Sequence, residues 1–149
     1  MTTRILAAPA LVFGILVALA FPVHAQTAPR QLVIHVDSPD AEVMTEALHN
    51  AANVIETERK AGETVAIEIV ANGPGSSIFI SELTPVADAV RNLHTTYPDV
   101  VMSLCQISFA HTEAATKKTL TVMPEARLVP SGAVRIMDLE QQHWAYLKP

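Results

Sequence analysis

Short apolar runs alternate with helix-forming segments from residue 32 to residue 147, and this alternation restricts the fold more than any other feature of the chain. The apolar runs predict five strands, at residues 32–36, 65–70, 100–104, 127–129 and 145–147. The segments between them predict helices, at residues 38–62, 84–97, 106–118 and 132–142. Each crossover between parallel strands lays a helix on the sheet. The sequence therefore predicts an α/β fold with a mostly parallel five-stranded sheet covered on both faces.

Local signals place the boundaries of the first helix and the depth of the second strand. Ser38 is suited to capping the helix, Pro39 to its first position and Gly62 to its end. The second strand alternates apolar residues but carries Glu68. A charged residue in a strand favours a position near the edge of the sheet.

The N-terminal segment has the pattern of a secretory signal. Arg4 is followed by residues 5–25 without a single charge, and this stretch ends in Val23-His24-Ala25. Small or β-branched residues at the last and third-last positions, after an apolar run, are typical of a signal-peptidase site. We therefore expect a signal peptide at residues 1–25, cleaved after Ala25, and one domain at residues 26–149. The protein would then be periplasmic or secreted and would have no membrane contact after cleavage. An uncleaved membrane anchor is the alternative, because the apolar run is nearly long enough to span a bilayer.

Charge and motifs exclude several classes of function. The chain has a formal net charge of −5 at pH 7 and no run of lysine or arginine, which argues against nucleic acid and anionic membranes as partners. The histidines form no recognised metal spacing, so no metal or cofactor is predicted. Gly73-Pro74-Gly75 lacks the Lys-Ser/Thr ending of a phosphate-binding loop and the spacing of a dinucleotide fingerprint.

Polar and small residues follow the predicted strands, at the edge where parallel sheets bind ligands. The candidates for a site there are Asp37, Ser38, Asn72, Gly73, Gly75, Cys105, Ser108 and Ser131. The stretch at residues 72–77 reads as a loop, because it is dense in turn-forming residues. If the strand order is 2-1-3-4-5, the first and third strands are neighbours and Cys105 lies beside Asp37 and Ser38.

Cys105 is the only cysteine of the chain, so it cannot form an intramolecular disulfide. In an oxidising compartment such a residue is buried and inert, paired with another molecule, or used as a thiol. The predicted helix at residues 106–118 begins directly after it, and a helix N-terminus lowers the pKa of a thiol. Ser108 offers the sulfur a hydrogen bond, and the loop around Gly73 and Gly75 would shape the pocket.

The sequence resembles the DsrE/DsrF-like family of sulfur-relay and intracellular sulfur-oxidation proteins. The resemblance rests on residues 50–54, the Gly73-Pro74-Gly75 loop, the Leu104-Cys105 strand end, the Pro130-Ser131-Gly132 turn and the ending with Gln141, Trp144, Tyr146 and Pro149. It implies a flavodoxin-like three-layer sandwich that assembles into homotrimers or homohexamers. It also implies that Cys105 carries a persulfide and exchanges sulfur with donor and acceptor proteins.

Two functional hypotheses follow from these observations. In the first, the protein is a periplasmic sulfur carrier or sulfurtransferase that accepts sulfane sulfur on Cys105. In the second, it is a non-catalytic oligomeric module that binds a small ligand or a partner, and Cys105 is structural. The sequence leaves open whether the protein is an enzyme.

Overall fold

The computed structural model describes residues 30–149, so the predicted signal peptide lies outside the described residues. The strands are β1 (Arg30–Val36), β2 (Val65–Ala71), β3 (Val101–Cys105), β4 (Arg127–Val129) and β5 (Ala145–Leu147). The helices are α1 (Ala41–Lys60), the 3-10 helix η1 (Gly73–Phe79), α2 (Ala87–Thr96), α3 (Gln106–Thr116) and α4 (Gly132–Gln141). The predicted order of elements is confirmed, and η1 replaces the loop expected at residues 72–77. Within the described part of the chain, no helix combines the length and the apolar character needed to cross a membrane.

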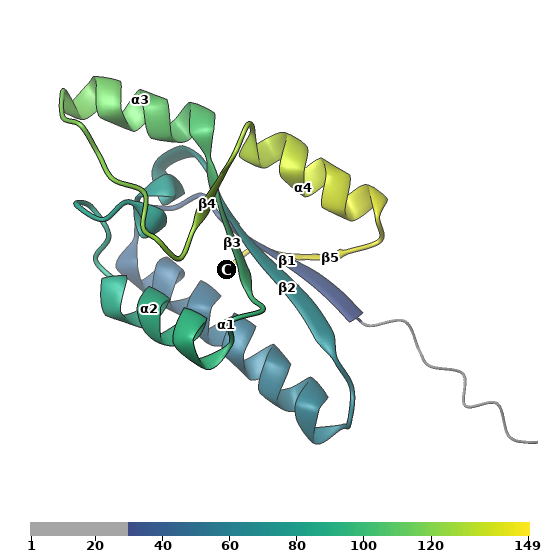
Figure 1. The fold of residues 1–149 in the computed structure, drawn as a ribbon. Coiled ribbons are helices and arrows are strands. Elements are labelled where there is room, and N and C mark those ends of the chain that lie inside the picture. The colour runs from purple at the N-terminus through teal and green to yellow at the C-terminus, as the bar shows by residue number, and fades with distance from the viewer. Residues whose placement is uncertain (1–29) are drawn as a thin grey trace, which may run out of the picture.

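All five strands are parallel, in the order β4-β3-β2-β1-β5. Helices α1 and α2 cover one face of the sheet and α4 covers the other, which gives a flavodoxin-like three-layer α/β sandwich (Figure 1). The order 2-1-3-4-5 considered from the sequence is therefore wrong for this chain. Because β2 lies between β1 and β3, the predicted neighbourhood of Cys105 with Asp37 and Ser38 does not form.

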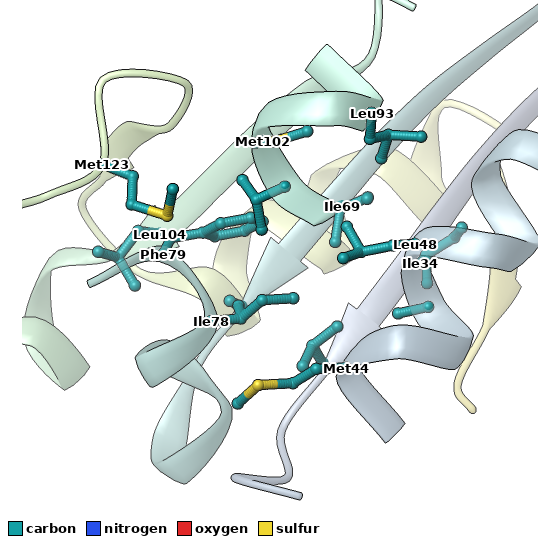
Figure 2. Packing of buried hydrophobic residues seen from close by; sticks show 14 of the residues in the cluster. Ile34, Met44, Leu48, Ile69, Ile78, Phe79, Leu93, Met102, Leu104 and Met123 are labelled. Carbon is teal, nitrogen blue, oxygen red and sulfur yellow. The ribbon is translucent and has the colours of Figure 1, made fainter. Parts of the chain in front are cut away.

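The larger core fills the space between the sheet and helices α1, α2 and η1. Figure 2 shows Phe79 and Ile78 of η1 packed among residues of the strands and α1. Met44 and Leu48 of α1 point to the sheet because they are four residues apart and share one helical face. Burial of these side chains is the main force that holds the two layers together.

Helix α4 covers the opposite face with a much smaller apolar cluster. Ile136 and Leu139 of α4 pack on Val33 of β1 and Val70 of β2. Alternate residues of the strands point to this side, which we call the α4 face. It comprises Val33, His35, Glu68, Val70, Ser103, Cys105, Arg127 and Val129.

Two predictions, the cap of the first helix and the position of the second strand in the sheet, are wrong for identifiable reasons. Helix α1 is capped by Asp40, whose carboxylate accepts the N–H of Glu42 at 2.8 Å, whereas Ser38 accepts the N–H of Asp40 at 3.2 Å. An aspartate one residue before the helix is as good a cap as serine and also favours the positive helix end. Strand β2 lies at the centre of the sheet and not near an edge. It can carry Glu68 there because the side chains of Arg127 and Arg135 neutralise the carboxylate.

Candidate functional site

Cys105 ends β3 and at the same time forms the N-cap of α3. Its backbone is extended, with φ −64° and ψ 118°, and the helix starts at the next residue. The residue is 4% exposed, and its side chain lies on the α4 face, since Ser103, two residues earlier, points to that face as well. The thiol is therefore placed where a strand, α3 and the start of α4 meet.

Gly132, the first residue of α4, lies against Cys105. A methyl group added to Gly132 would be 3.1 Å from Cβ of Cys105 and 2.9 Å from Cβ of Asn72. Both distances are shorter than ordinary carbon contacts, so any larger residue would push α4 away from the strand ends. The glycine thus lets the N-terminus of a second helix reach the cysteine.

The surroundings of the Cys105 sulfur are polar and favour a thiolate. Burial raises the pKa of this thiol, but the Ser108 hydroxyl and the backbone N–H groups of Gly132, Ser108 and Ile107 outweigh burial and lower the pKa below its usual value. The Cys105 side chain accepts no capping hydrogen bond from the backbone of α3. Their effect is mainly electrostatic and is greatest when the sulfur is charged.

Ser108 connects the cysteine to the segment after β2. Its hydroxyl oxygen accepts the backbone N–H of Gly73 at 2.8 Å. With this lone pair occupied, the hydroxyl hydrogen remains free to point at the sulfur. Gly73 has φ +52°, a left-handed conformation that glycine adopts without the strain of a side chain.

Asn72 joins the same site to β1 and to β5, the edge strand beside it. Its side-chain oxygen lies 3.0 Å from Nε2 of His35, and Nδ1 of His35 lies 2.7 Å from the hydroxyl of Tyr146. Since the amide oxygen only accepts, Nε2 of His35 donates the hydrogen bond to Asn72. No local pattern connects these residues, because their contact depends on β5 lying beside β1.

The remaining predicted site residues have other positions. Asp37 accepts a hydrogen bond from Lys148 at 2.5 Å, and this contact lowers the pKa of the Asp37 carboxyl although burial opposes it. Gly75 packs on the end of β1, where an added methyl group would be 2.4 Å from the carbonyl oxygen of Val36. Ser131 caps α4 by accepting the N–H of Val134 at 3.4 Å.

The structure therefore divides the predicted set into two groups. Asn72 and Cys105 lie against Gly132, the residue after Ser131, and Ser108 of α3 holds the backbone of Gly73 on the same side of the sheet. Asp37, Ser38 and Gly75 lie at the end of β1, on the far side of β2. Only the first group is in a position to influence the thiol.

Two surface cavities flank the cysteine without including it. One has a volume of about 490 Å³ and lies between η1 and α3, with Gly73, Ile107, Ser108 and His111 in its lining. The other has a volume of about 370 Å³ and lies between β4 and the first turns of α4. A third cavity, of about 440 Å³ and lined by Arg59 and Tyr97, lies at the opposite end of the strands, away from the thiol.

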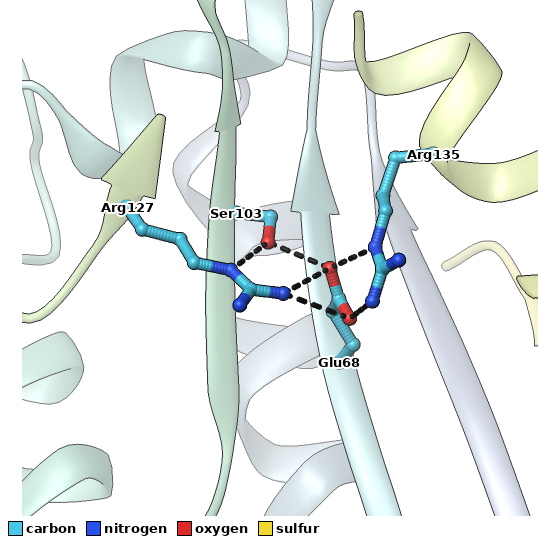
Figure 3. Close-up of polar contacts among 4 residues, drawn as sticks. All are labelled: Glu68, Ser103, Arg127 and Arg135. Atoms are coloured by element: carbon cyan, nitrogen blue, oxygen red, sulfur yellow. Dashed lines mark hydrogen bonds and ion pairs between the residues drawn. The ribbon is translucent and has the colours of Figure 1, made fainter. Parts of the chain in front are cut away.

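A buried charged cluster occupies the middle of the α4 face (Figure 3). Glu68 is 1% exposed and accepts hydrogen bonds from Ser103 at 2.6 Å and from Arg135 at 2.9 and 2.6 Å. Arg127 approaches the same carboxylate at 3.4 and 3.5 Å. Burial raises the pKa of Glu68, but these partners hold it below its usual range.

Sequence reasoning missed this cluster. The available signal was Glu68 itself, an acidic residue placed between Ile67 and Ile69 in an apolar strand. A charge in such a position needs a cationic partner if the strand is buried. Neither Arg127 nor Arg135 is marked by any local pattern as that partner.

The fold and the site define an α/β sandwich protein with a buried cysteine at the carboxyl end of β3, where α3 and α4 begin. A protein of unknown function from Methanobacterium thermoautotrophicum, MTH1491, has a similar structure, with a TM-score of 0.68 and 21% sequence identity over 80% of this chain and 99% of that chain. At this identity the likeness shows the shared fold alone. The chain matches no protein-family model and no curated protein.

Proposed function

We propose that the protein is a periplasmic sulfur carrier that holds sulfane sulfur as a persulfide on Cys105. The observation that carries the proposal is the position of Cys105 at the N-cap of α3, with Gly132, the first residue of α4, packed against it. These surroundings and the Ser108 hydroxyl lower the pKa of the thiol although burial opposes the shift. A sulfur that only fills space needs no such groups. The resemblance to the DsrE/DsrF-like family and the predicted export signal at residues 1–25 support the same reading.

The transfer needs no external oxidant. The Cys105 thiolate attacks the terminal sulfur of a donor persulfide, the donor's S–S bond breaks, and the donor leaves as a thiolate. A new S–S bond joins that sulfur to Cys105. An acceptor thiolate then attacks the outer sulfur, and Cys105 leaves as a thiolate.

The Ser108 hydroxyl and the nearby backbone N–H groups favour the thiolate of Cys105, which is present at the beginning and at the end of this cycle. The thiolate is both the attacking group and the final leaving group, so a lowered pKa favours release of sulfur to the acceptor. Donor and acceptor proteins, and a homotrimer or homohexamer, are the partners that the family resemblance implies.

A second function is favoured by the burial of the thiol. With 4% exposure, and with a cavity on either side that does not include it, Cys105 also suits a non-catalytic module in which a ligand or a partner occupies a cavity. In that case the cysteine would be a packing residue. The two functions differ in whether the native thiol reacts.

Alkylation separates the two functions. We expect iodoacetamide to modify the native protein at Cys105, with a rate that rises through a pKa below that of a free thiol. Modification only after denaturation would contradict the carrier function and support the binding module. The Cys105→Ser variant is the control for label at any other site.

Mass spectrometry tests the persulfide itself. Incubation with a persulfide donor should add one sulfur, about 32 Da, to the wild-type protein and nothing to Cys105→Ser. Digestion should then place the added mass on the peptide that contains Cys105. A folded, alkylatable wild-type protein that never gains this mass would refute the carrier function.

A further inference from the structure

Arg127 has a charge and hydrogen-bond donors that the protein itself uses only weakly. It extends from β4 across β3 toward Glu68 (Figure 3), but its contacts with Glu68 and Ser103 are 3.3 to 3.5 Å long. Glu68 already receives two short hydrogen bonds from Arg135 and one from Ser103. The Arg127 side chain is also 54% exposed, and its contacts with Ser103 and Glu68 use Nε and Nη2 but not Nη1.

Arg127 lines a cavity of about 370 Å³ between β4 and α4. Arg127 and Arg135 contribute positive charge to its wall, Asp138 contributes a carboxylate, and Ser131 lies at the α4 N-terminus. With Glu68 behind them, the two arginines and two carboxylates leave the site close to neutral. Such a site favours a ligand with both charges over a simple anion, and its volume suits a small molecule.

The cavity lies beside the thiol. Val129 lines it and is the register partner of Cys105 in the neighbouring strand. Arg127 pairs with Ser103, two residues before Cys105 on the same face, which corresponds to about 7 Å along the strand. A group held by Arg127 would therefore lie within the length of one small molecule from the sulfur.

We propose that this cavity binds a small α-amino-acid thiol or its persulfide, with the carboxylate on Arg127 and the ammonium group on Asp138. The planar guanidinium pairs with a carboxylate through two parallel hydrogen bonds. The sulfur end of the ligand lies toward Val129 and Cys105. The assignment names a donor for the proposed carrier function and rests on it for its chemistry: Cys105 attacks the terminal sulfur of the persulfide, and the amino-acid thiolate leaves.

Binding is measured apart from chemistry in the Cys105→Ser variant. The probe is S-methyl-L-cysteine, which has the amino-acid group but no sulfur to transfer, titrated into labelled protein and followed by NMR. We expect saturable shifts at residues around the cavity and a loss of affinity of about tenfold or more when Arg127→Gln is added. Arg91→Gln is the matched control, because Arg91 is 52% exposed on α2 and should leave binding unchanged.

Two fragments of the probe test the recognition of both charges. 3-(Methylthio)propanoate lacks the amino group and 2-(methylthio)ethylamine lacks the carboxylate, so both should bind more weakly than the complete amino acid. The inference is overturned if no probe saturates, if Arg127→Gln binds as well as its Arg91→Gln counterpart, or if a fragment binds as tightly as S-methyl-L-cysteine.

Transfer from cysteine persulfide to wild-type protein distinguishes this inference from the proposed function. Sulfur transfer that is equally fast in Arg127→Gln would overturn the donor site and leave the carrier function intact. Binding of S-methyl-L-cysteine that depends on Arg127, in a protein that never gains sulfur, would support the cavity as an amino-acid site and refute the carrier function.

Discussion

Replacing Arg135 by methionine should destabilise the protein strongly, because it removes the main partner of a buried charge. Glu68 is 1% exposed, and Arg135 supplies two of its three short hydrogen bonds. Removing one partner of a buried ion pair typically costs about 3–5 kcal/mol in the free energy of unfolding. Ser103 and the more distant Arg127 still face the carboxylate, so we expect a value near the lower limit, about 3 kcal/mol.

The loss should depend on pH in a defined direction. The pKa of Glu68 is lowered in the folded protein, so its contribution to stability is present above the pKa of the unfolded chain, about 4.3, and is lost as the pH falls through the folded value. In Arg135→Met most of that contribution is already gone. The difference in stability between wild type and variant should therefore be full at pH 7 and shrink below about pH 4.

Urea unfolding of wild type, Arg135→Met, Glu68→Met and the double variant measures these effects. The double variant removes both charges and should recover most of the loss, since apolar residues of similar size often replace a buried ion pair at little cost. A loss below about 1 kcal/mol in Arg135→Met, or a double variant as unstable as Arg135→Met alone, would refute the reasoning.

Three further substitutions test the site and the packing and capping of the elements around it. Ser108→Ala should raise the apparent pKa of Cys105 and slow its alkylation at neutral pH, because the thiolate loses a hydroxyl donor, whereas Ser77→Ala, in the same region but bonded to the Pro74 carbonyl, should leave both unchanged in the same pH titration. Gly75→Ala should lower the free energy of unfolding by about 2–3 kcal/mol, since its methyl group would meet the backbone of β1, and an equally stable variant would contradict the close packing of η1 on that strand. Asp40→Ala should lower the free energy of unfolding by about 1 kcal/mol, because α1 loses its cap. If chemical denaturation showed this loss for Ser38→Ala and none for Asp40→Ala, Ser38 would be the cap, as expected from the sequence.

The order and kind of the secondary-structure elements, apart from η1, are determined by the sequence itself. The apolar runs at β4 (Arg127–Val129) and β5 (Ala145–Leu147) have the bounds read from the pattern, and α3 starts directly after Cys105 as expected. These features depend on residues close together in the chain, namely apolar periodicity, turn residues and helix-starting signals. The same local information predicts that a thiol at residue 105 meets a helix N-terminus and Ser108.

The order of the strands and the partners of buried charges were decided only by the tertiary structure. No local signal distinguishes β4-β3-β2-β1-β5 from other parallel arrangements, so the neighbours expected for Cys105 were replaced by Asn72 and Gly132. Glu68 suggested an edge because its partner Arg135 is 67 residues away in the chain. Contacts over such distances form only when the layers pack, and the packing places a second helix N-terminus against the cysteine and the half-exposed Arg127 in the neighbouring strand.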